Sequence, residues 1–183
     1  MFISEFIQER LGLKGPMPFE PLSLRFEKKS FVTKIKDIEN HVYFLQKGIV
    51  EVGIHKEGDE KIIDFVFAGQ FFSSYTSFLL RKPSDVYITC LTECMVEAIP
   101  YEVLQEAYKV SLLANQFGRI ITETAFMERV KREKDFLSKS AEERYLELIE
   151  RRPEVIQLIP GGRIAKYLGI HPESLSRIRK AIS

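Results

Sequence analysis

The sequence predicts an α+β protein: a β-rich N-terminal domain, then one long helix, then a small helical C-terminal domain. Three observations support this order. Short β-like runs alternate with glycine and polar turns between Leu22 and Pro100. A helical pattern without proline runs from Ser111 to about Leu137. Two short amphipathic helices then flank Gly169. We therefore expect domains at 1–110, 111–137 and 138–183.

Charge is distributed unevenly along the chain. The 183 residues are 45% hydrophobic and 29% charged, as in a water-soluble globular protein, and the net charge is +1. Residues 1–110 carry 13 basic and 16 acidic side chains, whereas residues 111–183 carry 14 and 10. The basic excess therefore lies in the C-terminal part, where it would favour a polyanionic partner.

The two cysteines, Cys90 and Cys94, lie in an apolar, strand-like run and are too few for a disulfide framework. A spacing of four in a strand would place them on one face but far apart, so we expect buried, reduced thiols rather than a redox pair. The chain begins without a basic leader and has no apolar run long enough to span a bilayer, so we expect a cytoplasmic protein.

The N-terminal domain begins with a helical spacing over residues 1–14, which Gly15-Pro16 interrupts. The strand-like runs that follow are separated by polar or glycine turns, with a hairpin turn at 57–60. They are 31–35, 41–45, 48–54, 61–67, 70–72, 86–90 and 94–99. Many short strands with closely spaced turns predict a sandwich, jelly roll or barrel.

Pro100 starts a short helix to Tyr108, and the long helix of 111–137 follows it. Apolar positions in the long helix step by four and three, which predicts a heptad seam for a homodimer. The seam is Leu113, Phe117, Ile120, Thr124 and Met127. The alternative is a helix packed on its own domain, which Ile121 and Phe126 also permit.

A capping box, Ser140 with Glu143, starts a helix that runs from Ala141 to about Arg152 and ends before Pro153. The apolar run from Val155 to Ile159 predicts a short strand. Pro160-Gly161-Gly162 follows it, and together they suggest a small wing.

The last stretch predicts a helix-turn-helix. Ile164, Ala165 and Leu168 share one side of a short helix, and Gly169 can adopt the left-handed conformation that ends it. Pro172 and Glu173 suit the first turn of the next helix, whose Leu175 and Ile178 form a buried face. The alternative is an ordinary amphipathic hairpin with a solvated basic face; the order of small, turn and apolar residues favours DNA binding.

The residues from Gly169 to Ile178 closely resemble the recognition helix of the Crp/Fnr family of bacterial transcription regulators. Glu173, Ser176 and Arg177 match the family's pattern in order, with Pro172 where the Crp side often has arginine. The resemblance implies a cyclic-nucleotide-binding-like β-roll, with Gly48 and Gly69 at its turns, a dimerisation helix and a winged helix-turn-helix. It also implies a homodimer on double-stranded DNA, with RNA polymerase as a further candidate partner.

The outward residues of the second helix are expected to read DNA. Arg177 can donate to guanine and Glu173 can accept from cytosine, and Ser176 completes the base-reading set. Side chains expected to hold phosphates are Arg163, Lys166, Ser174, Arg179 and Lys180.

The resemblance also implies where an effector would bind. The family's cyclic-nucleotide cassette falls on Ser74 in place of glutamate, and on Ser84 and Asp85 in place of arginine and serine. Without the cation, and with Asp85 repelling a phosphate, we do not expect cyclic AMP to bind. The candidate pocket for another, apolar or aromatic effector is Phe71, Phe72, Ser74, Tyr75, Ser84, Asp85 and Tyr87; a filled core without ligand is the alternative.

No cofactor, metal or enzymatic activity is predicted. An iron–sulfur sensor would need N-terminal cysteines, and His41, His55 and His171 are isolated from one another. The sequence thus predicts a dimeric, sequence-specific transcription regulator of the Crp/Fnr type with an unknown effector. The alternative is a small-molecule or cyclic-nucleotide sensor module whose main partner is not DNA.

Overall fold

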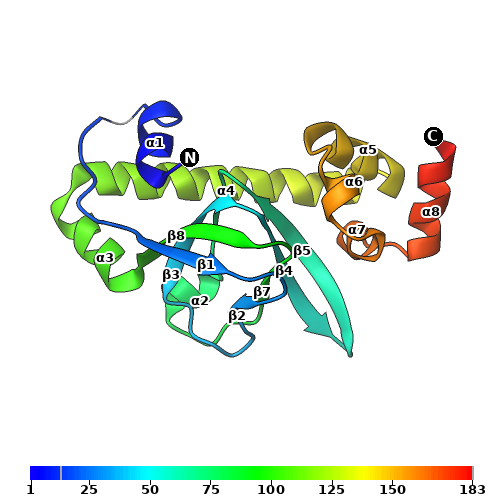
Figure 1. Cartoon of the computed structure of the whole chain (residues 1–183), viewed down its shortest axis with the longest axis horizontal. Helices are drawn as coiled ribbons and strands as arrows, with labels where there is room; N and C mark the ends of the chain where they lie inside the picture. Colours follow the sequence, from blue (N-terminus) through cyan, green and yellow to red (C-terminus); the bar gives the residue numbers. More distant parts are fainter. Residues whose placement is uncertain (13, 183) are drawn as a thin grey trace. The chain divides into compact units, whose positions relative to one another are not determined.

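The computed structural model describes residues 1–12 and 14–182, and it has the predicted order of a β-rich part, a long helix and a helical part (Figure 1). The N-terminal elements are α1 (Ile3–Glu9), β1 (Leu22–Phe26), β2 (Phe31–Thr33), β3 (His41–Lys47), β4 (Ile49–Lys56), β5 (Asp59–Phe67), β6 (Phe71–Phe72), α2 (Tyr75–Leu80), β7 (Tyr87–Cys90) and β8 (Cys94–Pro100). The short helix α2 was not predicted.

Two four-stranded sheets form the β-roll. One has the order β1-β8-β3-β6 and the other β2-β7-β4-β5, so each sheet combines strands from the beginning and the end of this region. β3 pairs antiparallel with β8, with Tyr43 opposite Ala98. The expected β-roll is therefore confirmed, and its apolar interior includes Tyr43, Leu45, Val50, Ile88 and Val96.

Gly48 allows the sharp turn between β3 and β4. Its φ of +106° lies in the region that favours glycine, and a Cβ there would meet the Glu93 carbonyl oxygen at 2.5 Å and the Cys94 sulfur at 2.7 Å. A side chain at this position would therefore force apart the turn and the start of β8.

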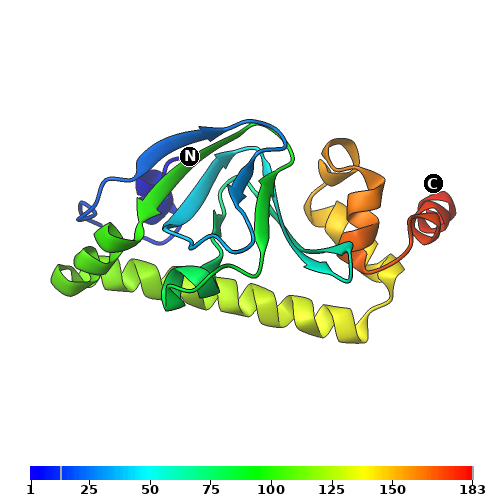
Figure 2. The same ribbon diagram turned by 90° about the horizontal axis from the view of Figure 1, so that it is seen from below.

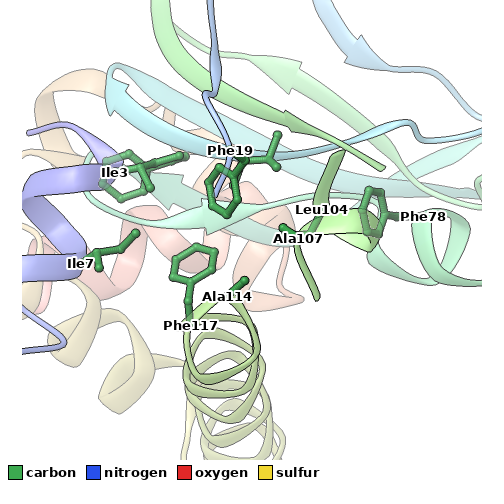
Figure 3. Packing of buried hydrophobic residues seen from close by; sticks show 10 residues of the cluster. Ile3, Ile7, Phe19, Phe78, Leu104, Ala107, Ala114 and Phe117 are labelled. Carbon is green, nitrogen blue, oxygen red and sulfur yellow. The ribbon is translucent and has the colours of Figure 1, made fainter. Parts of the chain in front are cut away.

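A second apolar cluster joins the roll to the helices that follow it. It is formed by Ile3, Ile7, Phe19, Phe44, Phe78, Ile99, Leu104, Ala107, Ala114 and Phe117. Figure 3 shows Phe117 pointing from the long helix toward Phe19 and the side of α1 that carries Ile3 and Ile7; the Phe19 and Phe117 ring centroids lie 6.0 Å apart. The first turns of the long helix are thus part of the N-terminal core.

The C-terminal part of the chain is helical. Its elements are α3 (Tyr101–Val110), α4 (Leu112–Ser138), α5 (Ala141–Arg151), α6 (Val155–Leu158), α7 (Gly161–Leu168) and α8 (Pro172–Ala181). α4 has 27 residues, and Figure 2 shows it as one unbroken helix. The predicted capping box starts α5: Ser140 accepts from the Glu143 N–H, and the Glu143 carboxylate accepts from the Ser140 N–H.

The chain divides into two compact units, and each unit is built from two separate segments of the sequence. One unit comprises Met1–Val52 with Phe65–Ala125. The other comprises Gly53–Asp64, the outer part of the β4–β5 hairpin, with the chain from Phe126 onward. The first half of α4 thus belongs to the β-roll, and its second half belongs to the helical unit.

The wing strand expected at 155–159 is wrong. Val155–Leu158 form the short helix α6, and the Val155 N–H donates to the Arg152 carbonyl at 3.0 Å. Val155 and Ile159 are buried whereas Gln157 between them is exposed, so the run follows a helical rather than a strand period. A short apolar run cannot be assigned by its pattern alone.

The expected separation of the two thiols is also wrong. Cys90 ends β7 and Cys94 begins β8, so the turn at 91–93 folds one back toward the other. The thiols hydrogen-bond to each other; this bond and burial raise the pKa of Cys90, whereas the same bond lowers that of Cys94. Both are free and buried, as expected.

Candidate nucleic-acid interface

The two short helices predicted on either side of Gly169 are present. α7 ends at Gly169, whose φ is +72°, and the Ile170 N–H donates to the Ala165 carbonyl at 3.0 Å. His171 caps α8, and Pro172 lies in its first turn. Ile164, Ala165, Leu168 and Leu175 are buried, so the opposite side of α8 faces outward.

The three residues predicted to read bases lie together on that outward side. Glu173, Ser176 and Arg177 are all exposed. The Arg177 Nη2 lies 3.4 Å from Ser174 Oγ of the same helix. Ser174 itself is half-buried, and Lys180 is exposed in the last turn. α8 therefore presents a carboxylate, a hydroxyl and a guanidinium that can contact base edges in a major groove.

Arg179 does not share this face. Its Nε donates to the Tyr145 hydroxyl at 3.1 Å, and its guanidinium lies 5.6 Å from the centre of the Tyr145 ring. Tyr145 is buried on α5, so Arg179 joins α8 to the interior of the helical unit. We therefore move Arg179 from the predicted phosphate set to the residues that hold the helices together.

The two predicted phosphate ligands on α7 are already paired with carboxylates. Arg163 Nη1 lies 2.7 Å from Glu60 Oε2, and Lys166 Nζ lies 3.1 Å from Asp59 Oδ1 and 3.6 Å from Glu60 Oε2. Both acids belong to β5 at the tip of the β4–β5 hairpin, within the same compact unit as α7. Sequence patterns gave no signal for these pairs, because the partners are over 100 residues apart.

The predicted heptad seam divides into two parts. Phe117 is only 3% exposed and packs against Phe19 and Phe71, so it is a core residue and cannot contact a second chain. Leu113 and Ile120 are half-buried, whereas Thr124 and Met127 are exposed. Phe126, expected to pack on its own domain, is 63% exposed. An apolar surface on α4 therefore exists, but it lies toward the middle of the helix.

The residues of the candidate effector pocket do not line one cavity. Phe71 packs against Phe6, Phe44 and Phe117, while Phe72 lies in the other cluster and stacks on Tyr43. The hydroxyls of Ser74 and Ser84 bond to each other at 2.7 Å and are buried.

The other members of that set are divided between core and surface. Tyr87 is buried and donates to Glu51 at 3.2 Å. Tyr75 and Asp85 are exposed. This arrangement agrees with the alternative of a filled core.

Sequence reasoning missed the anchoring role of Glu39 and Arg81. The buried Glu39 carboxylate accepts from the Tyr43 hydroxyl at 3.1 Å and from the N–H groups of Asn40 and His41. Arg81 donates to the Glu39 carbonyl at 2.6 Å and lies 4.3 Å from the centre of the Tyr101 ring. Arg81 lies between Ser74 and Ser84 in the segment expected to carry the effector site, and it instead holds the loop that contains Glu39. A lone glutamate beside a strand carries no pattern from which this could be predicted.

Comparison with known proteins agrees with this geometry. Residues 23–111 match the family model described as a cyclic nucleotide-binding domain. FixK2 of Bradyrhizobium japonicum superposes with a TM-score of 0.73 at 18% identity, over 90% of this chain and 85% of that one. A putative Crp/Fnr regulator of Eubacterium rectale gives 0.70 at 16% identity, over 88% and 77%. No curated protein matches the sequence.

The chain has the Crp/Fnr fold. The resemblance expected from the recognition helix is thereby confirmed at the level of the fold, from the β-roll to the C-terminal helices. The CLP regulator of Xanthomonas campestris, described as responsive to c-di-GMP, shares this fold with a TM-score of 0.67 at 18% identity, over 88% of this chain and 86% of that one. A Crp/Fnr fold therefore does not by itself specify which ligand the roll accepts.

Two further observations on the described residues concern metal ions and membranes. In residues 1–12 and 14–182, no three His, Cys, Asp or Glu side chains are grouped so that they could hold a metal ion. Over the same residues, no helix combines the length and apolar character needed to cross a bilayer.

Proposed function

We propose that this chain is a sequence-specific, DNA-binding transcription regulator of the Crp/Fnr type that acts as a homodimer and does not respond to cyclic AMP. The observation that carries the proposal is the outward face of α8. Glu173, Ser176 and Arg177 are exposed together on a helix that follows a glycine turn, in the order of the family's recognition pattern. Such a regulator would act in the cytoplasm, and RNA polymerase is its candidate partner.

In this proposal α8 enters the major groove with its N-terminal half. Arg177 donates two hydrogen bonds to the acceptors of a guanine, and Glu173 accepts from a cytosine amino group. Lys180 neutralises a phosphate and thereby fixes the position of the helix without reading sequence. Two chains would place two such helices about 34 Å apart, one turn of DNA.

The dimer would form through the middle of α4. Met127 is 64% exposed and Phe126 63% exposed, so this part of α4 leaves two large apolar side chains in contact with water. A second copy would remove this apolar area from water, which is the dominant favourable term in association. Ile120 and Thr124, on the same seam as Met127, would extend the contact.

The test is a binding panel of single-base operator variants, with the preferred operator first selected from a random duplex pool. Arg177→Ala should cost about 1–3 kcal/mol on the preferred site and relax the choice at one base pair in each half-site. Lys180→Ala is the control: it should weaken all duplexes alike and reduce the salt slope by about one. If Arg177→Ala weakened every duplex equally, α8 would not be the reading element.

The second candidate is a sensor module whose main partner is not DNA. It rests on the match of residues 23–111 to the cyclic nucleotide-binding domain model. A small molecule retained on purification, with no salt-dependent binding to any duplex, would favour this candidate over the regulator.

A further inference from the structure

The tip of the β4–β5 hairpin places two carboxylates on the basic side of α7. Glu57 and Gly58 have φ angles of +54° and +80°, which suits the tight turn of a hairpin. The turn is followed directly by Asp59 and Glu60. Their oxygens contact Arg163 and Lys166 at 2.7 to 3.6 Å, so both cations of α7 that we assign to DNA phosphate are occupied.

Three of the four side chains in the contact are partly shielded from water. Arg163, Glu60 and Lys166 are 33%, 34% and 36% exposed, whereas Asp59 is 52% exposed. Hydrogen bonds from Lys61 and then from Lys166 lower the pKa of Asp59 to about 2, so this carboxylate is ionised at neutral pH. The hairpin tip therefore places two carboxylates beside the two cations that we expect to contact DNA phosphates.

We propose that Asp59 and Glu60 act as an intramolecular phosphate mimic that competes with DNA for Arg163 and Lys166. This inference rests on the proposed function of the chain. The contact does not involve Glu173, Ser176 or Arg177, so it lowers affinity for every duplex and leaves the choice of bases unchanged. Movement of the hairpin away from α7 would raise affinity without any change in the recognition helix.

The competition has a distinct salt signature. A cation that pairs with phosphate normally releases a counterion from the DNA, and each such contact adds about 0.9 to the slope of log K against log salt. In the wild type, Arg163 and Lys166 must first leave Asp59 and Glu60. The freed carboxylates then take up cations from the salt solution, and this uptake offsets the counterions released from the DNA. The two contacts therefore add almost nothing to the slope. Without the carboxylates, each chain should gain up to about 1.8 in slope.

The test compares the full-length wild type with Asp59→Asn/Glu60→Gln, which keeps shape and removes charge. On operator and on random duplex alike, the variant should bind at least tenfold tighter at low salt and show the steeper slope. The control is Glu57→Gln, which removes a charge from the exposed turn of the same hairpin. It should leave the affinity and slope of the wild type in place.

A second background makes the test specific. In Arg163→Ala/Lys166→Ala, adding Asp59→Asn/Glu60→Gln should change nothing, because the cations for which the acids compete are gone. If the wild type binds DNA and the acid variant matches its affinity and slope, the mimic is disproved and the proposed function stands. If neither protein binds any duplex at low salt, the proposed function fails and the mimic fails with it.

Discussion

Arg179 on α8 donates a hydrogen bond to the hydroxyl of Tyr145 on α5, and its guanidinium also makes a cation–π contact with the Tyr145 ring. This pair joins the recognition helix to the interior of its unit. Arg179 is therefore a structural residue. From the sequence alone it could not be distinguished from a residue that binds phosphate.

The first prediction follows from this pair. Arg179→Lys keeps the charge but loses the Nε donor, so it should reduce the free energy of unfolding by about 1 kcal/mol. Lys180→Gln should leave stability unchanged and weaken binding to all duplexes. Thermal melts and a salt titration of DNA binding separate the two; an Arg179→Lys protein that melts normally but binds every duplex weakly would contradict the assignment.

The second prediction concerns the dimer. Met127→Glu should place like charges across the two-fold axis and yield folded monomers whose melting no longer depends on protein concentration. Phe117→Ala should instead cost about 3–5 kcal/mol of stability, because it opens a cavity in the N-terminal core. Sedimentation equilibrium measures the first effect and thermal unfolding the second, with Arg129→Glu, on the other side of α4, as the control for charge. A dimeric Met127→Glu protein would place the interface elsewhere.

The third prediction concerns cyclic AMP. Ser74 and Ser84 use their hydroxyls on each other, and the cassette offers no arginine to a phosphate. Titration calorimetry should detect no binding of cyclic AMP up to about 1 mM, which means a binding free energy weaker than about −4 kcal/mol. Asp85→Ala removes the repulsion but supplies no cation, so it should not create binding. Low-micromolar affinity in the wild type would overturn this interpretation.

The fourth prediction concerns the ion-pair network between α4 and α5. Glu147 accepts from Lys131 at 2.7 Å, Lys139 at 2.6 Å and Arg151 at 2.7 Å. Hydrogen bonds from Lys131 and then Lys139 lower the pKa of the Glu147 carboxyl below its ordinary value of 4.5. Glu147→Gln should therefore reduce stability at pH 7, by about 1 kcal/mol.

The pH dependence of this effect has a definite sign. Because the folded-state pKa is depressed, the stabilisation is present above pH 4.5 and is lost as pH falls through the folded-state pKa. The difference between wild type and Glu147→Gln in chemical denaturation should shrink below pH 4.5 and in 1 M salt. Glu150→Gln, an exposed change on the same helix, should show no such difference. A gap that persisted at pH 2 would exclude the ionic explanation.

Local signals predicted the most. Gly169, Pro172 and the spacing of Leu168 and Leu175 each restrict the chain over a few residues, and the two helices that flank Gly169 formed as expected. The strands of the roll, from β2 to β8, also followed from alternation and turns. Where a short run could satisfy two periods, as at Val155–Leu158, pattern alone gave the wrong element.

Contacts between distant residues could not be predicted in this way. The seam of α4 was predicted from spacing, but only the packing against Phe19 and Phe71 shows that Phe117 belongs to the core. Cys90 and Cys94 approach each other because a turn separates β7 from β8, whereas the prediction placed both cysteines in one strand. Glu60 pairs with Arg163 although the two residues are 103 positions apart in the sequence. Counting charges along the sequence shows only that the C-terminal region is basic, and it does not predict this pair.

The division of the chain limits how this protein can be recombined. The helical unit includes Gly53–Asp64, which lies inside the β-roll's own sequence. A single splice in α4 that exchanged the roll for that of another protein of this fold would transfer α5 to α8 without Asp59 and Glu60. Under the proposed function, such a chimera would keep the DNA specificity of α8 but lose the competition from the hairpin tip. The two halves of the protein are thus not interchangeable modules, and the recognition helix and the hairpin tip must be inherited together.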